Sequence, residues 1–239
     1  MHYWNKDNFE GLTSLAAALA ARDDFADLTD YCRLREAGLR REAFAALNTF
    51  LVCADTWESV KSQDAVNAVL TLYYRTPGCH QFLTQPLLNR FVYPALQRWS
   101  EDDPESIVPV RWLAILRRDP ELLSRVLAAD PSDVAIRRML IERQLSSVDY
   151  ATHHLSEGLF IGELDEALED LGRATALIQE ASDGRPLSDL AQEARQYGQL
   201  LFDWQAYQAR PVGTFPEWCA ARGRDYRWSI AVYYGEGVT

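Results

Sequence analysis

Two histidines and a glutamate near the middle of the chain are the side chains best suited to chemistry. His153 and Glu157 are four residues apart, so on a helix they would share one face, and His154 adjoins them. A histidine and a carboxylate at this spacing could bind a metal ion, or act as a general base and its orienting group. Extending this face by one turn each way adds Asp149, which could be a ligand, and Ile161, which could not. Because a metal site needs at least a third ligand, we expect a surface pair here, or a buried histidine that makes a hydrogen bond.

A stripe of acidic side chains along one predicted helix is the second candidate. The stripe consists of Asp165, Glu166, Glu169 and Asp170. Paired carboxylates perform acid–base catalysis only inside a cleft that shifts the pKa of one of them. The opposite face of the helix is apolar and consists of Leu164, Ala167, Leu168 and Leu171. We therefore expect the acidic stripe to be solvated, or, together with His153 and Glu157, to contact a basic partner.

No other motif in the chain predicts a reaction. The sequence has no glycine-rich phosphate loop of the P-loop or dinucleotide-binding type, and no nucleophile elbow. Its cysteines are too widely spaced for a structural zinc site; they are Cys32, Cys53, Cys79 and Cys219. Cys32 and Cys53 fall within apolar helical patterns, which predicts buried free thiols. We expect no catalytic residue, no cofactor and no metal.

Helical periodicity extends over nearly the whole chain, so the elements that position these side chains are predicted to be helices. Apolar residues recur at helical spacing in segments that are joined by short connections. The expected helices span 7–21, 25–37, 39–54, 58–75, 105–118, 121–129, 130–145, 146–160, 163–181 and 187–208. Residues 79–99 are expected to form two helices with a break, because Pro86 and Pro94 each remove a backbone donor. The predicted fold class is all-α, built from stacked antiparallel hairpins.

Several helix starts are predicted from capping residues. Asp119-Pro120 and Asp130-Pro131 each place an aspartate cap before a proline in the first turn. Ser146 or Ser147 is expected to cap a separate helix that runs to Phe160.

The C-terminal tail, 212–239, differs from the rest because it is rich in tyrosine and tryptophan. Such a segment is expected to cover the exposed core of the last hairpin as a cap. Residues 226–234 could form a strand or a helix, since their β-branched residues permit either, and we favour a helix.

Negative charge is concentrated in the middle of the chain. The net charge is −11, and residues 101–183 hold 18 acids and 8 bases, a net of −10. The charge balance changes near residue 100, which predicts an N-terminal half, 1–100, and a C-terminal half, 101–239, unless the two form one continuous domain. The excess of acids argues against nucleic acid as a direct ligand and favours a basic partner, although it would equally serve to keep the protein soluble.

Two segments resemble the second helix of a tetratricopeptide repeat. Each has a turn glycine, an alanine five residues later and a leucine four residues beyond that. The segments are Gly38-Ala43-Leu47 and Gly162-Ala167-Leu171, and Asp130-Pro131 is similar to the Asp-Pro between such repeats. The resemblance covers about a quarter of the chain, and Asp27 stands where the first repeat would carry tryptophan. It implies stacked helical hairpins that bind a protein or peptide on a concave face.

These observations favour a non-enzymatic, all-α interaction or scaffold protein. A narrower form of this hypothesis is an acidic inhibitor of the immunity or antitoxin type, which would block a basic toxin or nuclease. The alternative is an enzyme with a pocket in the helical array around His153, His154 and Glu157. The sequence shows no apolar run of transmembrane length and no signal peptide at its N-terminus, so we expect a cytoplasmic protein with no membrane partner.

Overall fold

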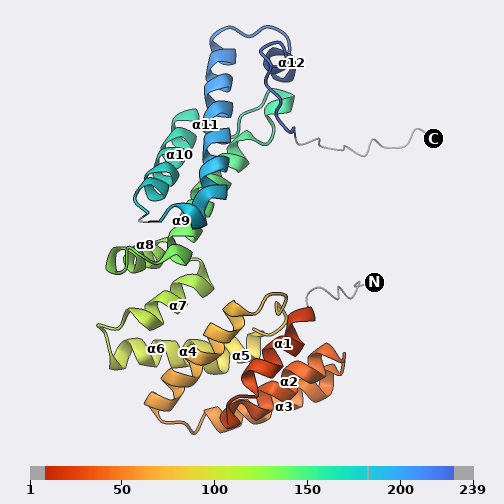
Figure 1. The fold of residues 1–239 in the computed structure, drawn as a ribbon, viewed down its shortest axis with the longest axis vertical. Coiled ribbons are helices and arrows are strands. Elements are labelled where there is room, and N and C mark those ends of the chain that lie inside the picture. The colour runs from red at the N-terminus through yellow and green to blue at the C-terminus, as the bar shows by residue number, and fades with distance from the viewer. Residues whose placement is uncertain (1–8, 182, 229–239) are drawn as a thin grey trace, which may run out of the picture. The chain divides into compact units, whose positions relative to one another are not determined.

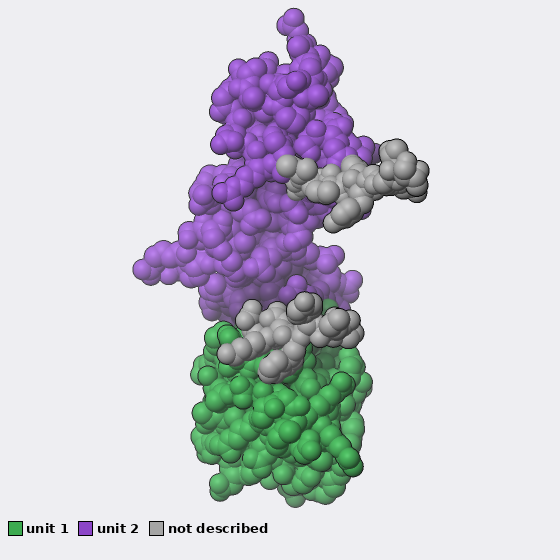
Figure 2. Space-filling model, turned by 90° about the vertical axis from the view of Figure 1, so that its right-hand side faces the viewer, with its two compact units in different colours: residues 1–117 green, residues 118–239 purple. Residues whose placement is uncertain are grey.

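A computed structural model describes residues 9–181 and 183–228, and it confirms the all-α class: no strand occurs in either range. The chain divides into two compact units, residues 1–117 and 118–239 (Figures 1 and 2). Within the described ranges, no helix is both long enough and apolar enough to cross a bilayer.

The first unit is built from seven α-helices in the part of it that the structure describes. They are α1 (Glu10–Leu19), α2 (Ala26–Glu36), α3 (Arg40–Ala54), α4 (Ser59–Arg75), α5 (Gln85–Leu87), α6 (Tyr93–Asp102) and α7 (Ile107–Arg117). The predicted hairpin is formed by α2 and α3, which Gly38 joins with a φ of +77°. Ala43 is fully buried on α3, which allows the two helices to approach closely.

Aromatic side chains fill the core of this unit. The ring of Phe50 makes edge contacts with Phe25, Trp57 and Phe91, at centroid distances of 6.5, 5.6 and 5.1 Å. Gly11 of α1 lies directly against the turn after α4, where its N–H donates to Gly78 O at 3.0 Å. A Cβ at this position would lie 2.0 Å from Pro77 O, so only glycine fits.

The predicted break within residues 79–99 is wrong. The chain forms one uninterrupted helical segment from α5 through a π-helical turn, Leu88–Val92, into α6. Pro94 lies in the first turn of α6, directly after that π-helical turn. A π-helical turn shifts the hydrogen-bond pattern by one residue, and the helix continues through the proline that would otherwise interrupt it.

The second unit contains five α-helices among its described residues. They are α8 (Pro120–Ala129), α9 (Val134–Thr152), α10 (Leu164–Gln179), α11 (Ser188–Ala209) and α12 (Phe215–Ala220). Gly162, with a φ of +81°, precedes α10 as predicted, and α9, α10 and α11 pack against one another in pairs. Their core includes Ile141, Leu145 and Ala174. Ala167 is also buried, beside Val148 and Leu201.

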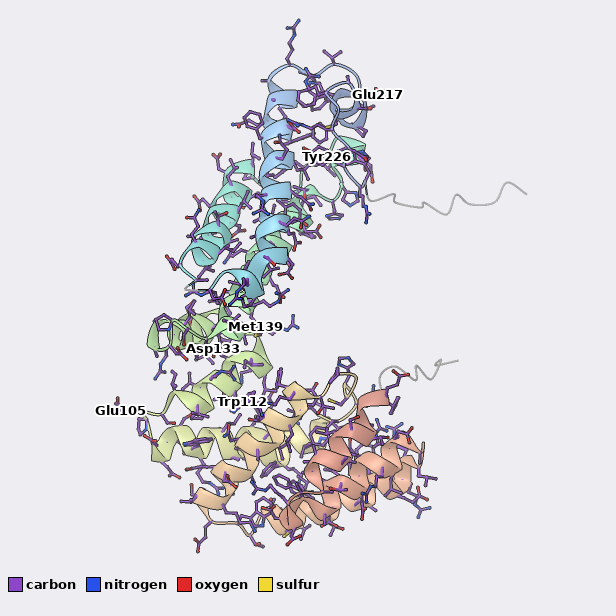
Figure 3. The ribbon with its side chains drawn as sticks, viewed as in Figure 1. Glu105, Trp112, Asp133, Met139, Glu217 and Tyr226 are labelled. Atoms are coloured by element: carbon purple, nitrogen blue, oxygen red, sulfur yellow. The ribbon has the colours of Figure 1, made fainter. Side chains whose placement is uncertain are left out.

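Two of the predicted helix starts in this unit are wrong and one is confirmed. Asp119 caps α8, and its carboxylate accepts from the N–H groups of Glu121 and Leu122. The cap of α9 is Asp133, which Figure 3 labels, rather than Asp130, because Pro131 and Ser132 form a turn before the helix begins.

Ser146 and Ser147 do not cap a helix but lie inside α9, which runs unbroken to Thr152. The reason is the apolar stripe, which continues through buried Leu145, Val148 and Ala151 and holds the helix against its neighbours.

The aromatic tail forms a cap, as predicted, over the residues that the structure describes. Phe215 and Trp218 on α12 pack with Trp204 of α11 and with Leu155. Tyr226 and Trp228 extend this cluster, but residues 226–228 are not helical, and 229–234 lie outside the described residues.

The two units divide between Arg117 and Arg118, and α7 packs on α6 within the first unit, whereas the charge balance of the sequence changes near residue 100. Two further expectations differ from the structure. Cys53 is exposed on α3, while Cys32 is buried as predicted. Leu168 is 39% exposed, so the apolar face of α10 is narrower than the sequence indicates.

Candidate functional site

His153 and Glu157 do not share a helical face. Helix α9 ends at Thr152, so the four-residue helical spacing does not apply to these side chains. Glu157 instead pairs with His154, whose Nδ1 lies 3.0 Å from Glu157 Oε1. His153 Nδ1 lies 2.6 Å from the backbone oxygen of Tyr150, and the two histidine rings are 4.1 Å apart between centroids.

The acidic stripe on α10 is only partly available to a partner. Asp165 and Glu166 are exposed, as predicted. Arg173, on the same helix, donates to Asp170 at 2.6 Å and lies 3.5 Å from Glu169. The positive charge of Arg173 therefore offsets part of the charge that the sequence assigns to this surface. In the described ranges, no group of three or more His, Cys, Asp or Glu side chains is arranged to hold a metal ion.

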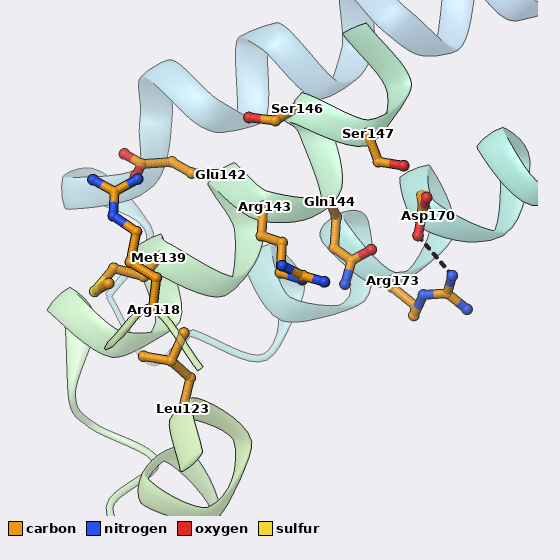
Figure 4. A pocket seen from close by; sticks show the side chains of 10 residues that line it. All are labelled: Arg118, Leu123, Met139, Glu142, Arg143, Gln144, Ser146, Ser147, Asp170 and Arg173. Atoms are coloured by element: carbon orange, nitrogen blue, oxygen red, sulfur yellow. Dashed lines mark hydrogen bonds and ion pairs between the residues drawn. The ribbon is translucent and has the colours of Figure 1, made fainter. Parts of the chain in front are cut away.

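Two grooves of the second unit take part of their lining from α9. We call the first the arginine groove, because Arg118, Arg143 and Arg173 line it (Figure 4). It has a volume of about 790 Å³ and runs along α9, with Leu123 of α8 and Asp170 of α10 also in its lining. The remaining lining residues are Met139, Glu142, Gln144, Ser146 and Ser147.

The two carboxylates of the arginine groove already have partners. Asp170 accepts from Arg173, and Glu142 accepts from Arg138 Nε at 2.9 Å. Arg118 and Arg143 have no hydrogen-bond or ion-pair partner in the part of the chain that the structure describes. The charges of this groove that stay available are therefore positive, in a segment whose net charge is strongly negative.

The second groove, which we call the carboxylate groove, lies between α9, α11 and residues 225–228. Its volume is about 940 Å³, within the size range of small-molecule pockets. Its charged lining residues are four acids and two arginines: Asp149, Asp189, Glu193, Asp225, Arg195 and Arg227. The rings of His153, Tyr197, Tyr226 and Trp228 also line it.

The surroundings of Glu193 in the carboxylate groove disfavour its negative charge. Burial, the largest cause, and then the negative charges of Asp149, Asp189 and Glu142 raise the pKa of Glu193 above its ordinary value of 4.5, against the opposing effect of Arg138. By contrast, the hydrogen bond from Arg138 lowers the pKa of Asp189 to about 2. Asp189 is therefore compensated, whereas Glu193 is not.

Comparisons with known proteins do not assign a function to these grooves. No protein-family model matches the chain, and no match is found among curated proteins or among solved structures.

A buried aspartate positions one wall of the carboxylate groove. Asp203 on α11 is 3% exposed and accepts from Gln199 Nε2 at 3.1 Å, from Arg224 Nε at 2.8 Å and from the hydroxyl of Tyr226 at 2.5 Å. These bonds tie the segment after α12 to α11, and Figure 3 shows Tyr226 beside the upper part of that helix. Because Tyr226 lines the groove and bonds to Asp203, Asp203 fixes the position of this wall.

The opposite wall is fixed by a bond between α9 and α11. The hydroxyl of Tyr197 donates to Asp149 Oδ1 at 2.8 Å, across 48 residues of sequence. Burial and this hydrogen bond raise the pKa of Tyr197 well above its usual value, so the hydroxyl remains a donor.

Sequence reasoning missed Glu193, Tyr197 and Asp203 as site residues. All three lie on α11. Tyr197 bonds to Asp149 on α9, Asp203 bonds to the segment after α12, and Glu193 lies near the charges of Asp149 and Glu142 on α9, so no local spacing links them to these neighbours. One available signal was Asp203, a carboxylate that follows Leu201 and Phe202 and precedes Trp204 within an apolar stretch. A buried charged residue is normally paired, so a carboxylate within an apolar stretch indicates a bonded partner elsewhere in the fold.

Proposed function

We propose that this protein is a non-enzymatic binding protein whose second unit receives a basic segment of a protein partner in the carboxylate groove. The observation that carries the proposal is the lining of this groove, in which Asp149 of α9, Glu193 of α11 and Asp225 face one cavity. Burial and repulsion from neighbouring carboxylates raise the pKa of Glu193, which is consistent with a site that favours a positive charge. A lysine or arginine side chain placed among Asp149, Glu193 and Asp225 would relieve that repulsion. The groove therefore binds cations better than its modest net charge alone would indicate.

Aromatic rings support the same ligand chemistry. Tyr197 and Trp228 line the groove together with the carboxylates. A guanidinium or ammonium group is attracted to the face of such a ring as well as to a carboxylate, and arginine stacks on rings especially well. A groove that combines acids with tyrosine and tryptophan favours basic side chains over small metal cations.

The location of this proposed site differs from the stripe on α10 that the sequence indicated. Asp165 and Glu166 are exposed on one helix and line neither the arginine groove nor the carboxylate groove, whereas Asp149 and Glu193 face a shared groove from two helices. Partly desolvated charges contribute more to binding than exposed charges, which mainly accelerate encounter. A basic toxin or nuclease held in this groove would be the inhibitor form of the proposal.

The experiment compares two double variants with the same change in net charge. Binding of a fluorescently labelled peptide of lysine and arginine is measured by anisotropy, with wild type, D149N/E193Q and D165N/E166Q. The groove variant should bind at least about tenfold more weakly, because each lost charged contact contributes about 1.5–3 kcal/mol. The stripe variant should change the Kd by less than about threefold, as expected of exposed charges.

Two results would contradict the proposal. If the wild-type protein does not bind the peptide, the groove is not a site for basic segments. If both double variants weaken binding equally, the attraction is a property of the net charge, and the groove has no particular role. Circular dichroism of both variants checks that the helices remain intact.

A further inference from the structure

The arginine groove differs from the carboxylate groove in the charges that it leaves unpaired, and its ligand can be inferred independently of the proposed function. We propose that it binds a ligand that carries acidic groups, either carboxylates or phosphates, through the guanidinium groups of Arg118 and Arg143. Two observations carry the proposal: the set of side chains that remain unpaired in the groove, and the backbone conformation of Arg118.

The charged side chains of the groove that remain unpaired are positively charged hydrogen-bond donors. Both of its carboxylates accept hydrogen bonds from arginines, Glu142 from Arg138 and Asp170 from Arg173. Arg118 and Arg143 are exposed and have no partner within the described residues. A planar guanidinium with free N–H groups suits a carboxylate or a phosphate, since either group can accept two parallel hydrogen bonds.

The backbone of Arg118 is in a conformation that L-residues rarely adopt. Its φ is +50°, and the six other residues with positive φ in the described ranges are all glycines. Arg118 directly follows the last residue of α7 and precedes Asp119, the cap of α8. Glycine is the usual residue after a helix end in this conformation, because any Cβ is strained there.

An arginine at that position therefore costs stability and places a guanidinium at the groove. Residues held in unfavourable backbone conformations concentrate at sites where the side chain has a function. Figure 4 shows Arg118 extending along α9 past Met139, while Arg143 lies farther along the same helix beside Gln144. Two separate guanidinium groups along one groove fit a ligand with more than one acidic group.

Serine hydroxyls and an apolar end complete the lining. Ser146 and Ser147 follow Arg143 along α9 and can donate to an anionic oxygen. Leu123 and Met139 lie at the end near Arg118 and offer apolar surface to the body of a ligand (Figure 4). The volume of the arginine groove, about 790 Å³, falls in the range of small-molecule sites.

The test uses two probes that separate the sources of the acidic groups. Isothermal titration calorimetry measures binding of a hexaglutamate peptide, which supplies carboxylates, and of pyrophosphate, which supplies phosphates. Binding of either probe to wild type is expected, and the probe that binds more tightly identifies the source. R118G and R143Q should each weaken that binding at least about tenfold, the equivalent of one charged hydrogen bond.

R125Q is the matched control. Arg125 is an exposed arginine on α8 that has no partner in the described ranges and does not line the groove. Its replacement removes the same charge and should change the affinity by less than about twofold.

R118G carries a second readout that separates a binding role from a structural one. Glycine relieves the strain at this φ, so the Tm of R118G should stay the same or rise by about 2–4 °C while anion binding falls. A lower Tm in R118G would overturn the inference, because the arginine would then serve the fold. The inference is also overturned if neither probe binds, if R143Q alone weakens binding, or if R125Q weakens it as much as the groove variants.

Discussion

The carboxylate groove and the arginine groove share α9 but leave opposite charges available. In the carboxylate groove, Glu193 stays uncompensated among like charges. In the arginine groove, each carboxylate has an arginine partner, and two further arginines remain unpaired. The difference shows that the charge offered by a surface depends on which side chains are already paired, and that the net charge of the segment is a poor guide to it.

Arg138 illustrates how a single side chain contributes to both surfaces. It donates to Glu142, which lines the arginine groove, and to Asp189, which lines the carboxylate groove. By neutralising one acid in each, it leaves Arg118 and Arg143 dominant in the first groove and Glu193 dominant in the second. The contrast between the grooves therefore rests partly on an arginine that lines neither of them.

Removal of the Asp203 carboxylate should have the largest effect on stability, and it should impair binding in the carboxylate groove but not in the arginine groove. In D203A, Gln199, Arg224 and Tyr226 lose a buried acceptor, so the free energy of unfolding should fall by about 2–3 kcal/mol. Binding of a basic peptide should be lost with the displaced wall, and binding of an acidic probe should persist. Urea denaturation and the two titrations measure this, and Y226F should show a smaller loss of about 1 kcal/mol. Loss of binding of both the basic peptide and the acidic probe would mean that the two grooves are not independent.

A larger side chain at a buried position of α10 should weaken binding in the arginine groove more than in the carboxylate groove. Ala167 is 3% exposed and packs beside Val148 and Leu201, so A167L should lower the free energy of unfolding by about 1–3 kcal/mol. Helix α10 supplies Asp170 and Arg173 to the arginine groove and contributes nothing to the lining of the other. Acidic probes should therefore lose more affinity than basic ones. A176L makes the same change at an exposed position of α10 and should leave stability nearly unaltered.

The pH dependence of stability should reveal the repulsion in the carboxylate groove. The folded-state pKa of Glu193 is raised above 4.5, so its contribution to stability is full below that pH and is lost as the pH rises through the raised value. E193Q should therefore be more stable than wild type at neutral pH, because it removes a carboxylate whose ionised form is disfavoured in the folded state. Denaturation curves at several pH values test this. A gap that stayed constant from acidic to neutral pH would show that Glu193 is not under strain from its neighbours.

The smallest effect is expected from freeing one more arginine. Asp170 holds Arg173 at 2.6 Å, so D170N should release that guanidinium into the arginine groove and strengthen binding of acidic probes by about threefold. Titration of D170N beside D165N, which removes an exposed acid of the same helix, measures the gain. Equal gains in both variants would indicate a general effect of net charge.

The sequence by itself determined most of the local structure. Helices α3 and α10, the turns at Gly38 and Gly162 and the cap at Asp119 follow from periodicity and from the backbone preferences of a few residues. Each of these features depends on interactions within one or two helical turns, which are visible in a short stretch of sequence.

Local rules failed where packing competed with them. Ser146 and Ser147 are good capping residues, yet the buried stripe of α9 keeps them inside a helix. Pro94 should interrupt a helix, yet a π-helical turn accommodates it. At Ser146 and Ser147, contacts with neighbouring helices outweigh a local preference of about 1 kcal/mol. At Pro94, the shifted hydrogen-bond pattern of the π-helical turn removes the conflict.

Only the tertiary structure decided which charges are free. The bonds of Arg138 to Asp189 and of Tyr197 to Asp149 join α9 and α11 across 51 and 48 residues of sequence. Such pairings follow from how the helices pack, which the spacing of residues along the chain does not encode locally. The sequence thus determined the helices and the total charge, and the packing of those helices determined where a cation or an anion can bind.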